Sequence, residues 1–137
     1  ARLEFQGQTS RAQNLLRMND VDLLLDTYPH TGGVTTAEGM WMGVPPITLA
    51  GDTVVSRLSY SFLQQVGLAD KFTAHSPAEY VALAQFWSEH VQDLNWQRRR
   101  LRQRMRQSIW LDPYQYTLKV EEAYRRVWAA WCGHEAK

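Results

Sequence analysis

The sequence contains little from which a disulfide-linked, membrane-spanning or metal-binding protein could be built. Its single cysteine, Cys132, cannot form an internal disulfide, so we expect a reducing compartment, the cytoplasm. No apolar run reaches the roughly 18 residues that a membrane span needs. The four histidines have no metal-ligand spacing, so we expect neither a metal nor any other cofactor. A formal net charge of +1 argues against a protein that coats nucleic acid.

What is present is typical of one folded α/β domain. The chain has 137 residues, of which 45% are hydrophobic, enough for a modest core. We expect a single domain over residues 1–137, with an α/β sheet core over 1–75 and a helical extension over 76–137. The segment RLEF, which is typical of a strand, begins at residue 2, and this favours a fragment of a longer protein.

Four short apolar segments alternate with helical patterns in the first 75 residues. Such alternation predicts right-handed crossovers and therefore a Rossmann-like parallel sheet of about four strands with flanking helices. The nearly continuous apolar run VDLLLDTYP is typical of a strand buried on both faces. The expected strands begin at RLEF, VDLLLDTYP, PITLAG and KFTA.

The stretch TGGVTTAEGMWMGVPP, residues 31–46, places two glycines and two threonines between an expected strand and an expected helix. Glycines allow close approach to a ligand, and a helix N-terminus favours an anion. Glu38, one turn into the helix, could accept hydrogen bonds from ribose hydroxyls. The pattern therefore indicates a nucleotide site, but a tight turn with a threonine cap explains it about equally well. No lysine follows the glycines, so this is not a Walker loop.

The sequence from residue 22 to 68 resembles the C-terminal catalytic region of the O-linked N-acetylglucosamine transferase and SPINDLY family. The shared order is Leu-Asp-Thr, a glycine–threonine turn, an acidic residue, Trp-x-Gly-x-Pro and a helix containing Ser-Arg. The later segment QYTLKVEEAYRRVW resembles the closing helix of that family. The resemblance implies the C-terminal, donor-binding lobe of a GT-B glycosyltransferase, which has two Rossmann-like lobes.

By position, the resemblance also implies a set of nucleotide-sugar-binding residues. The turn and the helix after it fall where the family holds the diphosphate, and the acidic residue falls at the ribose. The preceding loop and helix fall where the family contacts the base and sugar. These residues are Thr9, Arg11, Asn14, Arg17, Gly32, Gly33, Val34, Thr35 and Glu38.

Three departures from the family pattern are visible. Gly33-Val34-Thr35 stands where the animal enzymes have His-Thr-Thr, so backbone N–H groups must replace a side-chain donor to the phosphate. Asn14 replaces a histidine, and Glu38 replaces an aspartate. These changes fit a bacterial member and leave the sugar donor open.

The function implied is inverting, metal-independent transfer of N-acetylglucosamine from UDP-N-acetylglucosamine to protein Ser/Thr hydroxyls. The family's catalytic lysine, first lobe and tetratricopeptide repeats lie upstream, so we expect no catalytic residue in this chain and no turnover by it alone. Two alternatives stay open. One is a SPINDLY-type protein O-fucosyltransferase that uses GDP-fucose, and the other is a non-catalytic α/β interaction module.

Two basic features have competing interpretations. Six arginines between Arg98 and Arg106 could bind RNA or an acidic membrane, but apolar residues at helical spacing among them favour a solvated helix face. We therefore expect neither a nucleic-acid nor a membrane partner. Arg57 matches the family's Ser-Arg position, and an ion pair within the domain is the expected role.

Overall fold

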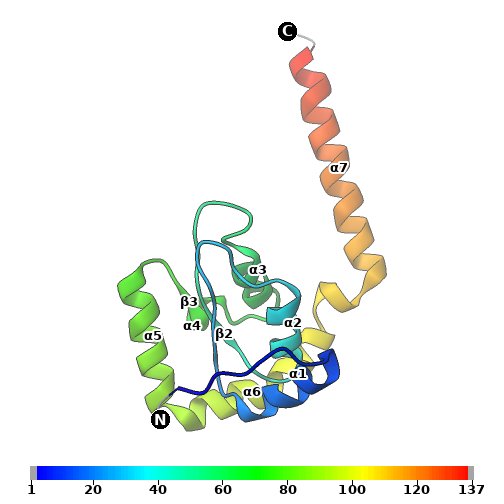
Figure 1. The fold of residues 1–137 in the computed structure, drawn as a ribbon. Helices are drawn as coiled ribbons and strands as arrows, with labels where there is room; N and C mark the ends of the chain where they lie inside the picture. The colour runs from blue at the N-terminus through cyan, green and yellow to red at the C-terminus, as the bar shows by residue number, and fades with distance from the viewer. Residues whose placement is uncertain (1–2, 136–137) are drawn as a thin grey trace.

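The computed structural model describes residues 3–135 as a small α/β body from which one long helix projects (Figure 1). In chain order the elements are α1 (Arg11–Arg17), the 3-10 turn η1 (Met18–Asp20), β1 (Leu24–Leu25), α2 (Val34–Trp41), β2 (Pro46–Leu49), α3 (Leu58–Gln65), α4 (Ala69–Phe72), β3 (Thr73–Ala74), α5 (Pro77–Glu89), α6 (Val91–Arg106), the 3-10 turn η2 (Ile109–Leu111) and α7 (Pro113–Glu135).

The strands form a parallel sheet in the order β1-β2-β3, which confirms the α/β class expected from the alternating pattern. Leu25 pairs with Ile47 between β1 and β2, and Leu49 pairs with Ala74 between β2 and β3. The strand expected at RLEF is wrong for its described residues, because residues 3–5 form no strand. Phe5 is 91% exposed, so the local apolar pattern finds no sheet edge to join.

The core lies between the sheet and its helices. Met40 of α2, Ile47 of β2, Leu63 of α3 and Phe72 of α4 have no exposed surface. Helices α5 and α6 complete the same cluster through Trp87, Leu94, Leu101 and Met105. Helix α5 packs against β2 and β3, and α6 packs against α2. The apolar side of α5 therefore covers the sheet, and that of α6 packs against α2 and α5.

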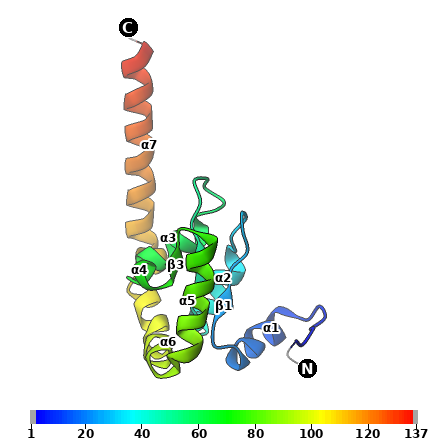
Figure 2. The same ribbon diagram turned by 90° about the vertical axis from the view of Figure 1, so that its left-hand side faces the viewer.

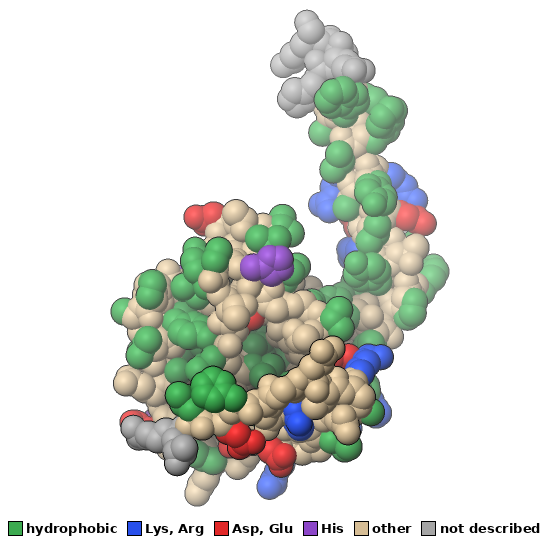
Figure 3. Space-filling model, viewed as in Figure 1, with side chains coloured by type: hydrophobic (Ala, Val, Ile, Leu, Met, Phe, Trp, Pro, Cys, Tyr) green, Lys and Arg blue, Asp and Glu red, His purple; other side chains and the backbone are tan. Residues whose placement is uncertain are grey.

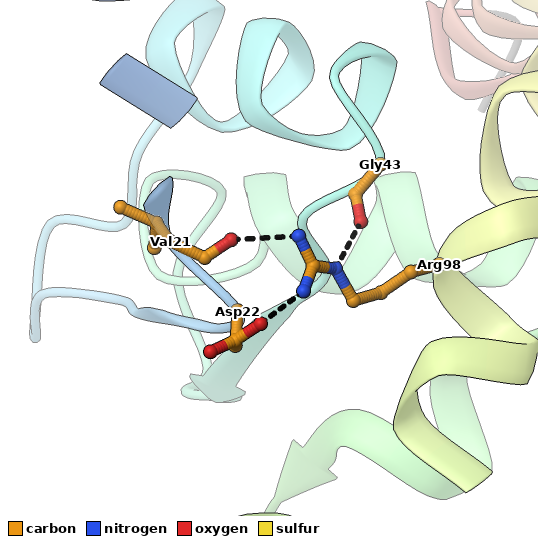
Figure 4. Close-up of polar contacts among 4 residues, drawn as sticks. All are labelled: Val21, Asp22, Gly43 and Arg98. Atoms are coloured by element: carbon orange, nitrogen blue, oxygen red, sulfur yellow. Dashed lines mark hydrogen bonds and ion pairs between the residues drawn. The ribbon is translucent and has the colours of Figure 1, made fainter. Parts of the chain in front are cut away.

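Arg98 connects α6 to the residues just before β1 and just after α2 (Figure 4). Its Nε donates to the carbonyl of Gly43 at 3.1 Å, its Nη2 donates to the carbonyl of Val21 at 2.9 Å, and its Nη1 pairs with Asp22. The last carbonyls of a helix and of a loop need outside donors, and the planar guanidinium can serve several at once.

The expectation of a solvated arginine face is therefore wrong for part of α6. Arg102 donates from Nε to the carbonyl of Trp41 at 2.6 Å, and Arg104 donates to the carbonyl of Val66 at 3.4 Å. The side chain of Arg98 is only 18% exposed. Periodicity identified the apolar side of the helix correctly, but it could not show that neighbouring carbonyls would need the arginines.

Helix α7 extends away from the body in both ribbon views (Figures 1 and 2). Its contacts are mainly with η2, the turn directly before it. Figure 3 shows hydrophobic side chains along this projecting helix. Trp128 is 68% exposed and Trp131 is 59% exposed, so the large apolar side chains of this helix have no covering surface in the described chain.

The two environments predict effects of very different size for the same substitution. Trp87 is 4% exposed, stacks on Phe72 with ring centroids 4.5 Å apart, and donates its indole N–H to the carbonyl of Lys71 at 3.0 Å. We expect Trp87→Ala to lower the free energy of unfolding by about 3–5 kcal/mol. The control Trp128→Ala should change it by less than about 0.5 kcal/mol. Urea unfolding followed by circular dichroism measures both, and equal losses would contradict this packing.

Candidate functional site

The carboxyl end of β1 opens into a pocket of about 180 Å³ beside the start of α2. Leu24, Leu25 and Asp26 line it from the strand side, and Gly32, Thr35 and Thr36 line it from the helix side, with Met18 and Thr27 completing the wall. The loops that follow β1 and β2 lie together at the upper end of the α/β body in Figure 1. In open α/β sheets this edge is where ligands bind.

Asp26 shapes the loop that forms this pocket. Its Oδ1 accepts a hydrogen bond from the backbone N–H of Gly32 at 2.8 Å, and its Oδ2 accepts one from the hydroxyl of Thr48 at 2.7 Å. The hydroxyl of Tyr80, on α5, donates to the backbone carbonyl of Asp26 at 2.9 Å. One residue thus ties the end of β1 to β2, to the glycine turn and to α5.

The sequence analysis did not identify this positioning role of Asp26. An aspartate that directly follows an apolar strand and precedes a glycine pair carries a usable signal. Such side chains commonly accept hydrogen bonds from the backbone of a following turn. The partner on β2, however, could be found only from the tertiary structure.

The two glycines of the turn have different reasons to be glycine. A Cβ on Gly32 would lie 2.1 Å from Oγ1 of Thr36, so packing within the turn excludes a side chain there. A Cβ on Gly33 would have no described atom within 4 Å, because this residue faces open space. Close packing therefore explains Gly32, whereas the open space at Gly33 is available to a ligand.

The start of α2 carries free hydrogen-bond donors. Gly33 is its N-cap and makes no side-chain capping bond, so the interpretation of Thr35 or Thr36 as a cap is wrong. Within residues 3–135 no acceptor is recorded for the N–H groups of Gly33, Val34 and Thr35. Unpaired N–H groups at the positive end of a helix dipole attract an anion. The cradle expected from the sequence is thus open and lies on the carboxyl edge of the sheet.

Helix α1 brings a positive charge to the same region. Ser10 caps it by accepting from the N–H of Gln13, whose side chain returns the bond in a capping box. The helix places Arg11 against α2, where its Nε lies 2.6 Å from Oε1 of Glu38. The Arg11 side chain is 78% exposed and that of Glu38 is 15% exposed. The structure therefore joins two residues that the resemblance assigns to one nucleotide site.

The other assigned residues lie around this pair without direct polar bonds to α2 in the described chain. Thr9 and Asn14 are half-buried at the start and middle of α1. Arg17 reaches back to the carbonyl of Gly7, with Nη1 3.4 Å away. Val34 is 73% exposed at the first position of α2. Their nucleotide-binding roles stay predictions, because this placement is compatible with such roles but does not test them.

Arg57 takes a different role from the one expected. Within residues 3–135 it forms no ion pair. Its Nη1 instead donates to the carbonyl of Gly51 at 2.9 Å, and its guanidinium lies 4.6 Å from the ring centroid of Tyr60. The side chain therefore braces the loop between β2 and α3, which borders the carboxyl edge.

The described residues contain neither a cluster of metal-binding side chains nor a helix that could span a membrane. Residues 3–135 contain no group of three or more His, Cys, Asp or Glu side chains placed to hold a metal ion. In the same part of the chain, no helix combines the length and the apolar character that crossing a membrane requires. The amides at the start of α2 and the ion pair of Arg11 with Glu38 are the polar groups that this site offers to a ligand.

Comparison with known proteins gives a consistent set of relatives. Residues 1–120 match the model of glycosyl transferase family 41. A rice protein named probable UDP-N-acetylglucosamine–peptide N-acetylglucosaminyltransferase SPINDLY is 38% identical over 85% of this chain. The enzyme named UDP-N-acetylglucosamine–peptide N-acetylglucosaminyltransferase in Caenorhabditis elegans is 24% identical over 93% of this chain.

A solved structure of a mutant O-GlcNAc transferase from Thermobaculum terrenum has the same fold. It superposes with a TM-score of 0.79 and 34% sequence identity over 91% of this chain. This chain spans about 24% of that protein and about 12% of the rice relative. The matched region is thus a small part of each relative.

Tyr80 provides a pH-dependent test of the contact that holds Asp26. Burial, and secondarily the charge of Asp26, raise the pKa of Tyr80 above its usual value of 10.0. The unfolded chain therefore loses the phenol proton at lower pH than the folded chain, and stability falls as pH rises from about 10 through the raised pKa.

Below pH 10, Tyr80→Phe should lower the free energy of unfolding by about 1 kcal/mol, because the hydrogen bond to the Asp26 carbonyl is lost. The difference in the free energy of unfolding between Tyr80→Phe and the wild type should shrink at higher pH. Urea titrations at pH 8 and 11 measure it. Tyr114→Phe, at a 70% exposed position on α7, is the control, and a pH-independent difference for Tyr80→Phe would contradict this account.

Proposed function

We propose, from the premise that this chain belongs to glycosyl transferase family 41, that it is the donor-binding part of a GT-B glycosyltransferase. The donor is UDP-N-acetylglucosamine and the acceptors are Ser/Thr hydroxyls of proteins. The names of the rice and C. elegans relatives support UDP-N-acetylglucosamine as the donor and a peptide as the acceptor. The observation that carries the proposal is the open, uncapped start of α2 on the carboxyl edge of the sheet.

The diphosphate occupies the space in front of Gly33 and accepts hydrogen bonds from the N–H groups of Gly33, Val34 and Thr35. Gly32 keeps the turn tight enough for these groups to converge, and the exposed hydroxyl of Thr35 adds a donor. The absence of a side chain at Gly33 lets phosphate oxygens approach the backbone. Backbone donors thus replace the side-chain donor of the animal enzymes at this position.

The ribose binds beside Glu38. Its Oε1 is held by Arg11, which leaves Oε2 to accept a hydrogen bond from a ribose hydroxyl. The ion pair fixes the orientation of the carboxylate before the ligand arrives, so less ordering is required on binding. Thr9 and Asn14 lie on the α1 side, where the base and the sugar bind, and Arg17 adds positive charge nearby.

The reaction is an inverting displacement in which an acceptor hydroxyl attacks the anomeric carbon and the nucleoside diphosphate leaves. The amides at the start of α2 stabilise the charge that develops on the leaving group, without a metal. Because the attacking base and the lysine on the diphosphate belong to the rest of the enzyme, this chain alone binds nucleotide at most weakly and does not catalyse transfer. Protein acceptors bind through the upstream lobe and tetratricopeptide repeats of the full enzyme.

A nucleotide titration tests the site directly. UDP added to the chain up to millimolar concentration should shift the backbone amide NMR signals of residues 32–38 with saturation. Signals of α7 should not move, because that helix lies away from the pocket. No shift at residues 32–38 would contradict the site and favour a non-catalytic interaction module.

The same titration with GDP distinguishes the two donors. Stronger binding of UDP supports UDP-N-acetylglucosamine, whereas stronger binding of GDP supports the SPINDLY-type alternative with GDP-fucose. The six curated SPINDLY relatives, at 35–38% identity, are the reason to include this comparison.

A single methyl group tests whether the diphosphate lies against Gly33. Gly33→Ala adds a Cβ that meets no described atom, so the fold should tolerate it, but the Cβ occupies the space assigned to the phosphates. We expect UDP affinity to fall at least about tenfold, which corresponds to about 1.4 kcal/mol.

The matched control is Gly133→Ala on α7, where an added Cβ also meets no described atom. It should leave UDP binding unchanged. Thermal unfolding of both variants checks that the fold is kept. Unchanged UDP affinity in a folded Gly33→Ala variant would contradict the proposed position of the diphosphate.

A further inference from the structure

The peptide group between Gly32 and Gly33 supplies the first amide of the proposed diphosphate site. Its carbonyl accepts a hydrogen bond from the hydroxyl of Ser59, on α3, at 3.1 Å. Within residues 3–135 no backbone N–H is recorded as a second donor to this carbonyl. Helix α3 packs against α2 (Figure 1), and Ser59 has no exposed surface, so its hydroxyl contacts the turn from the interior. The orientation of this peptide group therefore depends on one side chain from another element.

This contact determines which way the N–H of Gly33 points. A trans peptide group is planar, and its C=O and N–H point in opposite directions. The bond between Gly32 and Gly33 is trans, since the cis bond recorded within the described residues is that between Tyr28 and Pro29. Because Ser59 holds the Gly32 carbonyl toward the interior, the N–H of Gly33 points away from α3. Among residues 3–135 that N–H has no recorded acceptor, so it is available to a ligand.

The neighbouring groups of the turn are held by contacts of their own. The N–H and the hydroxyl of Thr31 both donate to the carbonyl of Val55, at 3.0 Å and 2.8 Å. The N–H of Gly32 donates to Oδ1 of Asp26 at 2.8 Å. Loss of the Ser59 hydroxyl would therefore release one peptide group while the rest of the turn stays in place.

The two glycines make this peptide group unusually dependent on the hydrogen bond. Neither Gly32 nor Gly33 has a side chain that restricts its backbone rotation, so the group between them can turn over when its carbonyl is not held. A group turned in that way would present its carbonyl oxygen, the negative end of its dipole, to the ligand. The bond from Ser59 favours the opposite orientation, and it also polarises the group so that its N–H becomes a stronger donor.

We propose that Ser59 is a positioning residue of the nucleotide site, whose buried hydroxyl keeps the N–H of Gly33 directed at the diphosphate. This inference rests on the proposed function, because it requires the diphosphate to lie at the start of α2. Ser59 acts through the peptide group and does not touch the ligand, since it is 0% exposed and bonds the end of the group that faces the interior. The hydroxyl of Thr36, 3.5 Å from the Ser59 oxygen, lies on the same inner side of the turn.

The substitution Ser59→Ala removes the hydroxyl and little else. We expect the variant to bind UDP about fivefold more weakly than the wild type, the ratio that the loss of one ordinary hydrogen bond gives. Titration of the backbone amide NMR signals of residues 32–38 measures this affinity. In the ligand-free variant, the signals of the Gly32 carbonyl carbon and the Gly33 amide should also shift, because the peptide group has lost its donor. These two signals report on the orientation of the group without any ligand.

The matched control is Ser108→Ala. Ser108 is 6% exposed, and its hydroxyl donates to the carbonyl of Met105 at 2.6 Å, so this variant also loses a buried bond from a serine to a carbonyl. Because Ser108 follows α6 and contacts no residue of the turn, its substitution should leave UDP affinity unchanged. Thermal unfolding measures the loss of stability in both variants. Equal weakening of UDP binding in the two would indicate general destabilisation and would overturn the positioning role.

A second variant keeps the test decisive if Ser59→Ala does not fold. Ser59→Cys has a side chain of similar size and a weaker donor, so its UDP affinity should lie between those of the wild type and Ser59→Ala. Wild-type UDP affinity in either folded variant, or an unchanged Gly32 carbonyl signal in Ser59→Ala, would overturn the proposal.

The wild-type titration separates this inference from the proposed function. If the wild type and Ser59→Ala bind UDP equally well, the nucleotide site is supported and the role of Ser59 is wrong. If the wild type binds neither UDP nor inorganic pyrophosphate, the proposed function is wrong and so is the role of Ser59. If the wild type binds pyrophosphate but not UDP, only the nucleotide assignment is wrong, and Ser59→Ala should then weaken the binding of pyrophosphate.

Discussion

The double hydrogen bonding of the Asp26 carboxylate is the interaction on which the carboxyl edge of this sheet depends. One oxygen holds the N–H of Gly32 and the other holds the hydroxyl of Thr48. The turn before α2 is thereby fixed relative to β2, and the contact from Tyr80 adds α5 to the same arrangement. Asp26 therefore holds the turn in place, and the first amides of α2 are left without protein acceptors.

This arrangement also explains how a carboxylate can lie close to a site for an anion. Both oxygens of Asp26 already accept hydrogen bonds, which disperse its charge toward the interior of the turn. On the other side of α2, Arg11 neutralises Glu38 at 2.6 Å. The groups left without a partner at the helix start are donors, and the helix dipole has its positive end there. The electrostatics of the edge therefore favour a diphosphate despite two nearby acids.

At the opposite edge of the molecule, the basic and the acidic side chains of α6 differ in their partners. Along α6, Arg98, Arg102 and Arg104 donate to backbone carbonyls of other elements, whereas Asp93 at its start has no ion-pair partner in the described chain. The basic residues of this helix thus bond carbonyls of neighbouring elements, and Arg100 lies over the ring of Trp96 with its guanidinium 3.7 Å from the ring centroid.

Several features of the fold and site were determined by the sequence alone. The run VDLLLDTYP contains β1, and Ser76, whose hydroxyl accepts a hydrogen bond from the N–H of Glu79, begins α5 as its N-cap, because short-range hydrophobicity and hydrogen bonding decide such elements. The glycine–threonine turn and its order relative to Glu38 indicated both the helix start and the family. These signals are local, and they do not depend on how distant segments pack.

Tertiary structure alone decided which distant groups became partners. Arg98 bonds the carbonyl of Val21, 77 positions away, and no periodicity could show that this carbonyl would need a donor. Trp87 became buried and Trp128 exposed, although both stand at apolar positions of helices, because only α5 has a sheet to cover. Phe5 likewise had the pattern of a strand but no edge to pair with. Burial and long-range hydrogen bonding require a partner surface, and that surface exists only after the chain has folded.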